Sequence, residues 1–363
     1  MARKMIRRNS RSDFGQGREQ MENQPSGNGI RSALLPILFL IACSGTQAVA
    51  AEVGGKPEKT EIIVTYVQPS GAFTPIWVAY EAGLFQKYGV NAKLQLLSPQ
   101  VSAQAVVAEE ADFYTNGPDL INARLNGARV KYFGGTIQEL VFQMWGAKEI
   151  GDIQQLKGRT VAASTPRAAL DTATREALKI NGMVPDRDVK ILYVQTVPAI
   201  LASIVSGKTD AGTLSAPNTL KAREAGLNLL VDIGKLKIPG LQVSYGTTEK
   251  YLKANPNTVY AFLKAIAEGV VLARKDPANA KKAIAKYAKI DEPKMLDDTY
   301  DTFAPYWALN LGVRPEATQA QFAYLDEKTL PQAKHADPKE FIDNSFVESL
   351  DKAGFLQKLG MSR

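Results

Sequence analysis

The sequence has very few residues of the kinds that enzymes use as nucleophiles and metal ligands. Its 363 residues include one cysteine and one histidine, which excludes most metal and nucleophile sites. It also lacks a Gly-x-Ser-x-Gly elbow, a phosphate loop with Gly-Lys-Ser or Gly-Lys-Thr, and a dinucleotide fingerprint. The single histidine, His335, lies in a late polar stretch where we expect it to be exposed. We therefore predict a protein that is not an enzyme and has no catalytic residue, metal or cofactor. A catalytic pair of carboxylates remains an alternative, because Asp and Glu residues are plentiful.

Long apolar runs are also scarce. The run at residues 33–42 is about ten residues long, which is too short to cross a bilayer. Basic residues precede it, and Ala48 and Ala50 follow it at the two small positions of a cleavage site. We predict a signal peptide over residues 1–50, cleavage before Ala51, and a periplasmic protein.

A second interpretation of the same segment remains open. Leu40, Ile41, Ala42 and Cys43 resemble a lipoprotein processing box, in which the cysteine carries the lipid and becomes the mature N-terminus. The alternative localisation is therefore a lipid anchor through Cys43. The basic region before the apolar run is unusually long, and Met21 is an alternative start.

A strong basic surface is missing as well. The net charge is +7, but residues 1–50 hold seven Lys or Arg and three Asp or Glu, so the remainder of the chain carries only +3. A nucleic-acid interface requires a clustered basic face, so we predict no nucleic-acid partner. The length and the 45% hydrophobic content are enough for about two lobes with substantial cores.

The sequence does contain an internal repeat. Residues 111–118 predict a short strand that leads into a helix beginning at Pro118, and residues 209–217 repeat this unit with Pro217. After each proline an alanine, an arginine and a glycine follow at the same offsets: Ala123, Arg124 and Gly127, then Ala222, Arg223 and Gly226. The repeat favours two similar α/β lobes, although coincidence between two ordinary strand-helix junctions is the alternative.

Strand and helix patterns alternate between residues 60 and 246. We expect strands near residues 61–67, 93–97, 111–117, 129–133, 140–145, 159–163, 190–194, 209–214 and 241–246, with helices between most of them. Beyond residue 246 we expect helices alone, near 259–270, 277–288, 294–307 and 338–353. This rhythm predicts mostly parallel sheets with helices on both faces.

Six of the predicted strands end in a polar loop and a helix that starts at or near a proline: Pro75, Pro99, Pro118, Pro166, Pro198 and Pro217. Such loops lie at the carboxyl edge of a parallel sheet, where ligands bind. Helix N-termini present free N–H groups and a partial positive charge, which suits an anion. The polar side chains in these loops form our candidate ligand site: Ser70, Thr74, Ser98, Asn116, Ser164, Thr165, Thr196 and Ser215.

Three further residues complete the candidate site. Arg167 is expected in the first turn of the helix after Pro166, where a cation opposes the helix dipole and a bound carboxylate or sulfonate would explain it. A solvated surface arginine is the alternative. Phe73 lies in a loop, and Tyr245 lies in the expected strand at residues 241–246, at the border of the presumed hinge between the two lobes. Either ring could contact a ligand, although aromatic residues more often belong to the core.

The segment Pro75–Ile76–Trp77–Val78–Ala79, followed by Gly83–Leu84–Phe85 and Tyr88–Gly89–Val90, resembles the nitrate, sulfonate and taurine type of ABC-transporter substrate-binding proteins. Further stretches are similar to the same family: Leu156–Lys157–Gly158–Arg159, Gly207 to Asp210, and Asn255–Pro256. The likeness covers roughly residues 60–290. It implies the type II periplasmic-binding-protein fold, with two mixed, mostly parallel α/β lobes joined by a two-strand hinge. We assign residues 60–145 to lobe 1, residues 146–242 to lobe 2, and residues 243–363 to the return into lobe 1 and the C-terminal helices.

The resemblance also implies a function. Such a protein, expected to be a monomer, binds a small ligand in the inter-lobe cleft and delivers it to an ABC permease and its ATPase. Members of the family bind nitrate, sulfonates, aromatic carboxylates or thiamine-precursor pyrimidines, so the ligand itself does not transfer. We expect a small organic anion. The alternative is a pyrimidine-precursor binding protein or synthase on the same fold, but the related synthases use a histidine in the site and this chain offers none there.

Overall fold

The structure is a computed structural model that describes residues 53–323, 325 and 330–361. The predicted signal peptide, its cleavage site and Cys43 lie outside the described residues.

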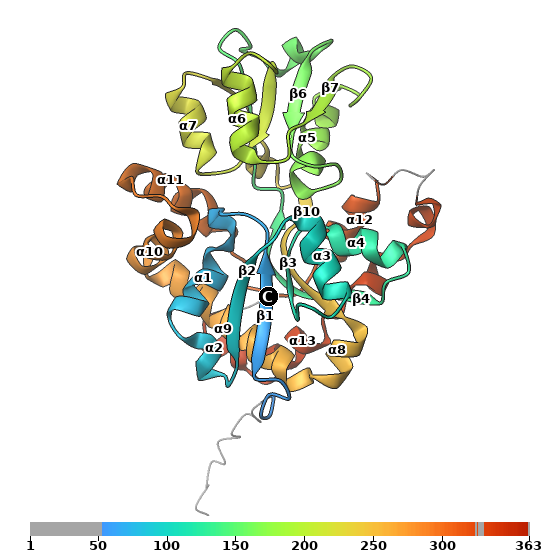
Figure 1. Ribbon diagram of the computed structural model, residues 1–363, viewed down its shortest axis with the longest axis vertical. Coiled ribbons are helices and arrows are strands. Elements are labelled where there is room, and N and C mark those ends of the chain that lie inside the picture. Colours follow the sequence, from blue (N-terminus) through green and yellow to red (C-terminus); the bar gives the residue numbers. More distant parts are fainter. Residues whose placement is uncertain (1–52, 324, 326–329, 362–363) are drawn as a thin grey trace, which may run out of the picture. The chain divides into compact units, whose positions relative to one another are not determined.

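Five strands build the first sheet (Figure 1). Strands β1 (Glu61–Tyr66) and β2 (Asn91–Leu96) pair in parallel, and β10 (Pro239–Thr248) pairs antiparallel with both β3 (Tyr114–Asn116) and β4 (Val130–Glu139). A parallel bridge between Val64 and Phe113 connects β1 to the segment that leads into β3. The resulting order is β2-β1-β3-β10-β4.

The second sheet contains β5 (Gln143–Gly146), β6 (Thr160–Ala163), β7 (Lys190–Tyr193), β8 (Ala211–Leu214) and β9 (Asn228–Asp232), in the order β7-β6-β8-β5-β9. Leaving the crossing strand aside, we number the strands of each sheet by their order in the chain. Across each sheet the second strand lies at the edge, followed by the first, the third, the crossing strand and the last. The crossing strands are β10 in the first sheet and β5 in the second. The two sheets thus repeat one topology.

The parallel and antiparallel pairings have different origins. Strands that are joined through a helix pair in parallel, as β1 with β2 and β6 with β7 do. The crossing strands run the other way, because β5 enters its sheet from β4 and β10 returns after β9, and both pair antiparallel with their neighbours. The fold is therefore α/β with mixed sheets, and the two crossings connect the sheets.

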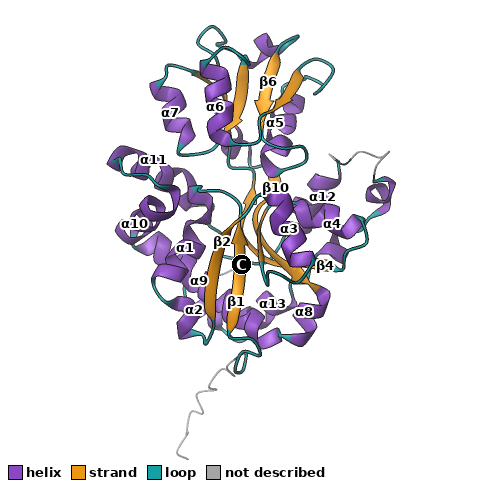
Figure 2. Cartoon of the chain, viewed as in Figure 1, coloured by secondary structure: helices purple, strands orange, loops and turns teal. Residues whose placement is uncertain are grey.

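Helices accompany the strands in both sheets and continue after them (Figure 2). The helices of the alternating part are α1 (Thr74–Glu81), α2 (Leu84–Lys87), α3 (Pro99–Val107), α4 (Asp119–Leu125), α5 (Ala169–Ile180), α6 (Val197–Val205) and α7 (Asn218–Glu224). The helices after β10 are α8 (Glu249–Ala254), α9 (Pro256–Lys275), α10 (Pro277–Ala288), α11 (Pro293–Phe303), α12 (Pro315–Phe322), α13 (Ser345–Lys352) and α14 (Phe355–Lys358). None of the helices within 53–323, 325 and 330–361 has both the length and the apolar character of a membrane span.

Several predicted elements need correction. The expected helix at residues 338–353 is a 3-10 turn (Pro338–Phe341) and then α13, because the backbone is extended at Ile342. The expected helix at 294–307 ends at Phe303 and continues as a 3-10 turn. The expected helix at Pro166 begins three residues later, at Ala169. Strand β9 and helices α8 and α12 were not predicted.

The structure confirms the internal repeat. Helices α4 and α7 follow the equivalent third strands, β3 and β8, and both have seven residues. Gly127 and Gly226 end them in the left-handed conformation, where glycine is the favoured residue. The helix starts differ slightly from the prediction, since Pro118 and Pro217 are themselves the N-caps and no side chain caps either helix.

An aspartate just before each repeated strand explains another part of the pattern. The Asp112 carboxylate accepts the Ile63 N–H (2.8 Å) and contacts Lys59, while the Asp210 carboxylate accepts the Thr160 N–H (2.9 Å) and contacts Arg159. Ile63 and Thr160 belong to the first strand of each sheet. Both aspartates therefore connect the third strand to the first, which is a structural role.

The carboxamide of Gln242 connects the two chain segments that cross between the sheets. Gln242 of β10 accepts the Val141 N–H (2.6 Å) and donates to the Val141 carbonyl (3.4 Å), and Val141 lies between β4 and β5. Gly240 lies close to this point, since a Cβ there would be 2.4 Å from Leu140 Cδ2. The predicted lobe boundaries, after residues 145 and 242, fall inside β5 and β10.

Candidate ligand-binding site

Most of the predicted site residues lie in the loops after β1, β2, β6, β7 and β8, while Asn116 ends β3 and Tyr245 lies within β10. In the second sheet the backbone connects two of these loops, because the Gln195 N–H donates to the Ser164 carbonyl (2.9 Å) and the Val194 N–H donates to the Ala163 carbonyl (3.0 Å). Thr196 follows directly and caps α6, its hydroxyl accepting the Ala199 N–H (3.3 Å). The loops after β6 and β7 therefore lie side by side.

The loop after β1 is buried. Ser70 caps a short 3-10 turn (Gly71–Phe73), and Thr74 donates its hydroxyl proton to the Gly71 carbonyl (2.7 Å). Thr74 is the first residue of α1, and Phe73 is its N-cap. The polar groups of this loop are thus used to hold the turn itself.

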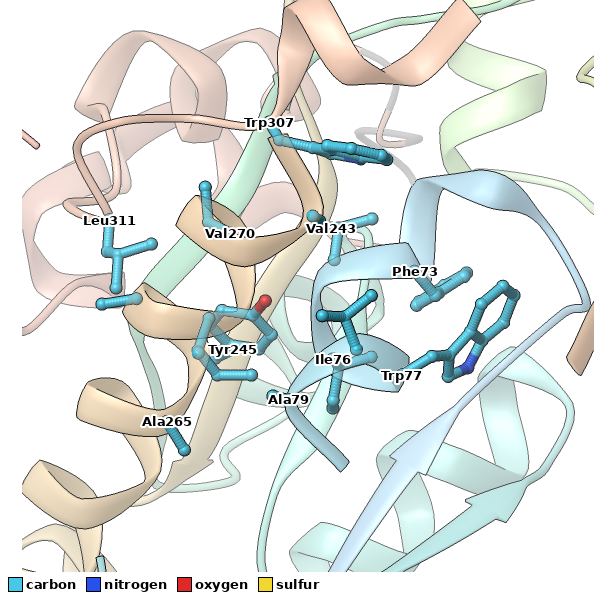
Figure 3. Close-up of a cluster of buried hydrophobic side chains, with 14 of the residues drawn as sticks. Phe73, Ile76, Trp77, Ala79, Val243, Tyr245, Ala265, Val270, Trp307 and Leu311 are labelled. Carbon is cyan, nitrogen blue, oxygen red and sulfur yellow. The ribbon is translucent and has the colours of Figure 1, made fainter. Parts of the chain in front are cut away.

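An aromatic cluster packs beneath that loop. Phe73, Tyr66 and Trp77 have ring centroids about 6 Å apart, and Trp77 stacks on Tyr287 at 5.2 Å. Figure 3 shows Phe73 and Trp77 with Tyr245 among the buried hydrophobic side chains that pack against the first sheet, which we call the first core. Tyr245 is fully buried and its hydroxyl lies 3.1 Å from Thr136 Oγ1. Phe73 and Tyr245 are therefore core residues in this structure.

Asn116, at the end of β3, belongs to a buried polar network. The Asp119 carboxylate accepts hydrogen bonds from Tyr114 Oη (2.5 Å) and Asn116 Nδ2 (3.2 Å), and the Tyr132 hydroxyl donates to the Gly117 carbonyl (2.8 Å). Burial raises the pKa of Asp119, and the hydrogen bonds offset only part of that effect. This network fixes the loop after β3.

The loop after β6 differs from its prediction. Arg167 does not lie in the first turn of α5 but in the turn before it, with a left-handed φ of 65°. Its backbone N–H donates to Asp171 Oδ2 (2.7 Å), which favours the turn over a helix, and its side chain is exposed. Ser164 and Thr165 are half-buried in the same loop.

Asp171 organises this loop. Its Oδ1 accepts from Arg175 Nε (3.1 Å) and Tyr193 Oη (3.1 Å), while Oδ2 accepts the Arg167 N–H. Burial raises the pKa of Asp171, and the charge of Arg175 offsets only part of the effect. The acid nearest the start of α5 is therefore already satisfied by its own neighbours.

The two sheets meet at the end of β3 and the start of α5. A Cβ at Gly117 would lie 3.3 Å from Ala169 Cβ, 3.9 Å from the Ala169 amide nitrogen and 2.8 Å from the Leu241 carbonyl oxygen. Gly117 is thus needed for close approach, since any side chain would force these segments apart. The N-terminus of α5, with Ala168 as an N-cap that offers no side-chain hydrogen bond, faces the carboxyl end of a strand of the other sheet.

The remaining predicted residues lie at separate positions. Ser215 is buried after β8, and its carbonyl accepts the Asn218 N–H (2.9 Å). Ser98 is exposed at the N-cap of α3. The structure connects Asn116 with the loop that contains Ser164, Thr165 and Arg167 through Gly117 and Ala169, and connects Thr196 with that loop through Gln195.

The sequence analysis missed two residues at this meeting point. Thr172 of α5 donates its hydroxyl proton to Gln321 Oε1 of α12 (3.2 Å), and both side chains are buried. No signal in the sequence pointed to Gln321, because the helix that carries it was not predicted.

Three surface hollows in the described part of the chain are lined by residues other than the predicted site residues. One of them, with a volume of about 610 Å³, is lined by His335 together with Arg124, Arg129, Glu249 and Glu340. His335 is exposed there, as predicted. Each oxygen of the Glu249 carboxylate is already paired, one with Arg124 and the other with Arg129.

Comparison with known proteins decides the family. The sequence matches the family described as NMT1/THI5 like over residues 70–280, which is more than half of the chain. The chain belongs to the NMT1/THI5-like family. The matched residues of this family member include every strand of both sheets except β1, which precedes them, and they end within α10. A sequence search of curated proteins finds no match.

Solved structures confirm the periplasmic-binding-protein fold of this family member. The alkanesulfonate-binding protein of Xanthomonas axonopodis pv. citri bound to MOPS is 17% identical, with a TM-score of 0.65 over 80% of this chain and 99% of that one. The periplasmic nitrate-binding protein of Synechocystis PCC 6803 is 16% identical, with a TM-score of 0.68 over 82% and 90%. The ligand-binding component of an ABC-type import system from Staphylococcus aureus, with zinc bound, is 12% identical, with a TM-score of 0.64 over 80% and 98%.

Proposed function

We propose that the protein is an extracytoplasmic substrate-binding protein of an ABC importer and that it binds a small organic anion at the N-terminus of α5, beside the end of β3. One observation carries the proposal: Gly117 of the first sheet lies so close to Ala169, at the N-terminus of α5, that a Cβ at Gly117 would be 3.3 Å from Ala169 Cβ. A helix N-terminus offers N–H donors and a partial positive charge to an anion.

The division of the chain into lobes belongs to the same proposal. Residues 60–145 with 243–363 would form one lobe and residues 146–242 the other, and movement about the crossings near Val141 and Gln242 would open and close the site. A permease and its ATPase are the partners that this role requires. A sulfonate or carboxylate fits the donor groups better than a neutral pyrimidine does, because N–H donors at a helix N-terminus favour negative charge.

A thermal-shift and calorimetric series on the purified protein tests the proposal. The panel consists of butanesulfonate, MOPS, butyrate, benzoate and nitrate, with 1-butanol as the uncharged control for the alkyl chain. At a hundred times its dissociation constant, a ligand that binds only the folded chain stabilises it by about 2.7 kcal/mol. We expect at least one organic anion to raise the melting temperature while 1-butanol does not.

Two results would contradict the proposal. If none of the anions raises the melting temperature or gives a calorimetric signal, the anion site is wrong. If one of the compounds is consumed by the purified protein, the protein is an enzyme and the transport role is wrong.

A further inference from the structure

Gln321 is an unusual residue for its position. It lies on α12, outside the residues that match the family, and only 3% of it is exposed. Its Oε1 accepts from Thr172, but its Nε2 has no hydrogen-bond partner among the described residues. One turn earlier on the same helix, the buried Thr318 hydroxyl has none there either.

Unpartnered buried donors are costly. Leaving a buried polar group without its hydrogen bond costs about 1–3 kcal/mol, so native proteins rarely tolerate one without a ligand or water to complete it. Eleven buried side-chain atoms of the described residues lack a partner, and Gln321 Nε2 and Thr318 Oγ1 are the two of them on α12. A hydrophobic residue at position 321 would avoid the cost if Gln321 only filled space.

The surroundings show what kind of acceptor fits. Thr172 is the fourth residue of α5, so its hydrogen bond places the Gln321 carboxamide at the first turn of that helix. The first turn presents N–H groups that no N-cap side chain satisfies. The nearest acid, Asp171, already accepts from the Arg167 N–H, Arg175 and Tyr193. The first turn of α5 and Gln321 Nε2 therefore offer several hydrogen-bond donors, while Asp171, the nearest acid, is already used as an acceptor.

We propose that Gln321 determines the specificity of the ligand site, its Nε2 donating a hydrogen bond to an oxygen of the organic anion held at the N-terminus of α5. This inference rests on the proposed function and names one residue of the same site. It assigns a role to the C-terminal helices, which the family match does not cover. A tetrahedral sulfonate, with three oxygens, can accept from α5 and from Gln321 at once.

The test compares Gln321→Leu and Gln321→Glu, with Gln86→Leu on the exposed face of α2 as the matched control. Leucine removes the donor and keeps the volume, so we expect it to weaken the best anion of the panel about tenfold. Glutamate places a negative charge beside the anion, so we expect a larger loss of about a hundredfold or more. Gln86→Leu should bind as the wild type does. Gln321→Leu removes the unpartnered Nε2 but also leaves the buried Thr172 hydroxyl without its acceptor, so the melting temperature of each ligand-free variant is measured and affinities are compared well below it.

Each outcome decides the question. If Gln321→Leu and Gln321→Glu bind the anion as the wild type does, Gln321 does not contact the anion and the specificity role is wrong, while the proposed function stands. If the wild type binds no anion at all, the proposed function fails first. Should the leucine variant lose its far-ultraviolet circular dichroism, Gln321→Met, which is unbranched and adapts to the same space, replaces it, and unchanged affinity in that variant overturns the proposal.

Discussion

The two sheets repeat one topology but use different side chains around it. The core of the first sheet is rich in aromatic rings, with Phe262 in contact with the rings of Phe85, Phe113, Phe133 and Tyr245. The core around the second sheet is largely aliphatic, with Phe142 and Trp145 as its fully buried aromatic residues among those described. The strand order therefore does not depend on a particular kind of packing, since two different cores support it.

The loops at the carboxyl edges of the two sheets carry most of the predicted site residues, and these differ in their exposure. In the first sheet the predicted site residues Ser70, Thr74 and Asn116 are buried and form hydrogen bonds within their own loops. In the second sheet Arg167 and Thr196 are exposed. The contrast is not complete, because Ser98 at the first edge is exposed and Ser215 at the second edge is buried. Among the exposed predicted site residues Arg167 is the charged one, and Thr196 already accepts the Ala199 N–H.

The largest expected effect tests the contrast between the cores. Phe262→Ala removes a ring that contacts four others, and we expect it to lower the free energy of unfolding by about 3–5 kcal/mol. Ile204→Ala, at a fully buried position of the second core, removes fewer atoms and no ring contact, so we expect a loss near the lower end of about 2–5 kcal/mol. Urea unfolding followed by circular dichroism measures both. A larger loss for Ile204→Ala would show that the aromatic cluster is not the more stabilising core.

The next prediction compares the two repeated aspartates. Asp112 has a side chain that is 5% exposed and Asp210 one that is 27% exposed, and each accepts a backbone N–H of the first strand. Loss of the carboxylate leaves that N–H unpaired, so we expect Asp112→Ala to cost about 1–3 kcal/mol and Asp210→Ala about 1 kcal/mol, because water reaches the second site. Equal losses in urea unfolding would mean that burial does not distinguish the two connections.

Asp210 also predicts a pH dependence. Partial burial acts to raise its pKa, but hydrogen bonds from the Thr160 N–H and Arg159 outweigh this, so its pKa is lowered. A carboxyl group with a lowered folded pKa stabilises the protein above its unfolded pKa of about 3.9, and this contribution is lost as the pH falls through the folded value. The difference in stability between wild type and Asp210→Ala should therefore shrink below about pH 4.

Much of this organisation could be predicted from the sequence. The repeat at Pro118 and Pro217 identified the third strand of each sheet, because a strand end, a short helix and a left-handed glycine recur at fixed offsets. The helix at residues 277–288 was predicted with the bounds it has. These features depend on local chemistry, and local chemistry is visible in a single sequence.

The rest depends on contacts that are distant in the sequence. Arg167 was placed in a helix because Pro166 favours a helix start, and the hydrogen bond from its backbone to Asp171 could not be foreseen. Phe73 and Tyr245 were predicted as ligand contacts, but packing places them in the core. Gln321 lies 149 residues from Thr172, so no spacing rule connects the two.

A fourth prediction exchanges a residue between the two copies of the repeat. Aligned on the prolines, Asp119 corresponds to Asn218, so Asp119→Asn gives the first copy the residue of the second. Burial raises the pKa of Asp119, so its charged form is unfavourable in the folded state and wild-type stability falls as the pH rises from about 3.9 through the folded pKa. Asparagine can still accept from Tyr114, and we expect a change of less than about 1 kcal/mol at pH 7. Urea unfolding should show the variant gaining relative to wild type between pH 4 and pH 7, whereas a constant difference would contradict the assignment.

The smallest expected effect separates the backbone of Arg167 from its side chain. The left-handed φ of 65° is unfavourable for arginine, so Arg167→Gly should raise the free energy of unfolding by up to about 1 kcal/mol, while Arg167→Ala should not. Both variants lack the guanidinium group, which is exposed, so both should weaken anion binding equally, by less than about 1 kcal/mol. Lys237→Gly, at an exposed residue with a φ of 51°, is the matched control and should gain stability without any change in affinity. Unequal affinities of the two Arg167 variants, measured by titration calorimetry, would mean that the loop conformation rather than the charge governs binding.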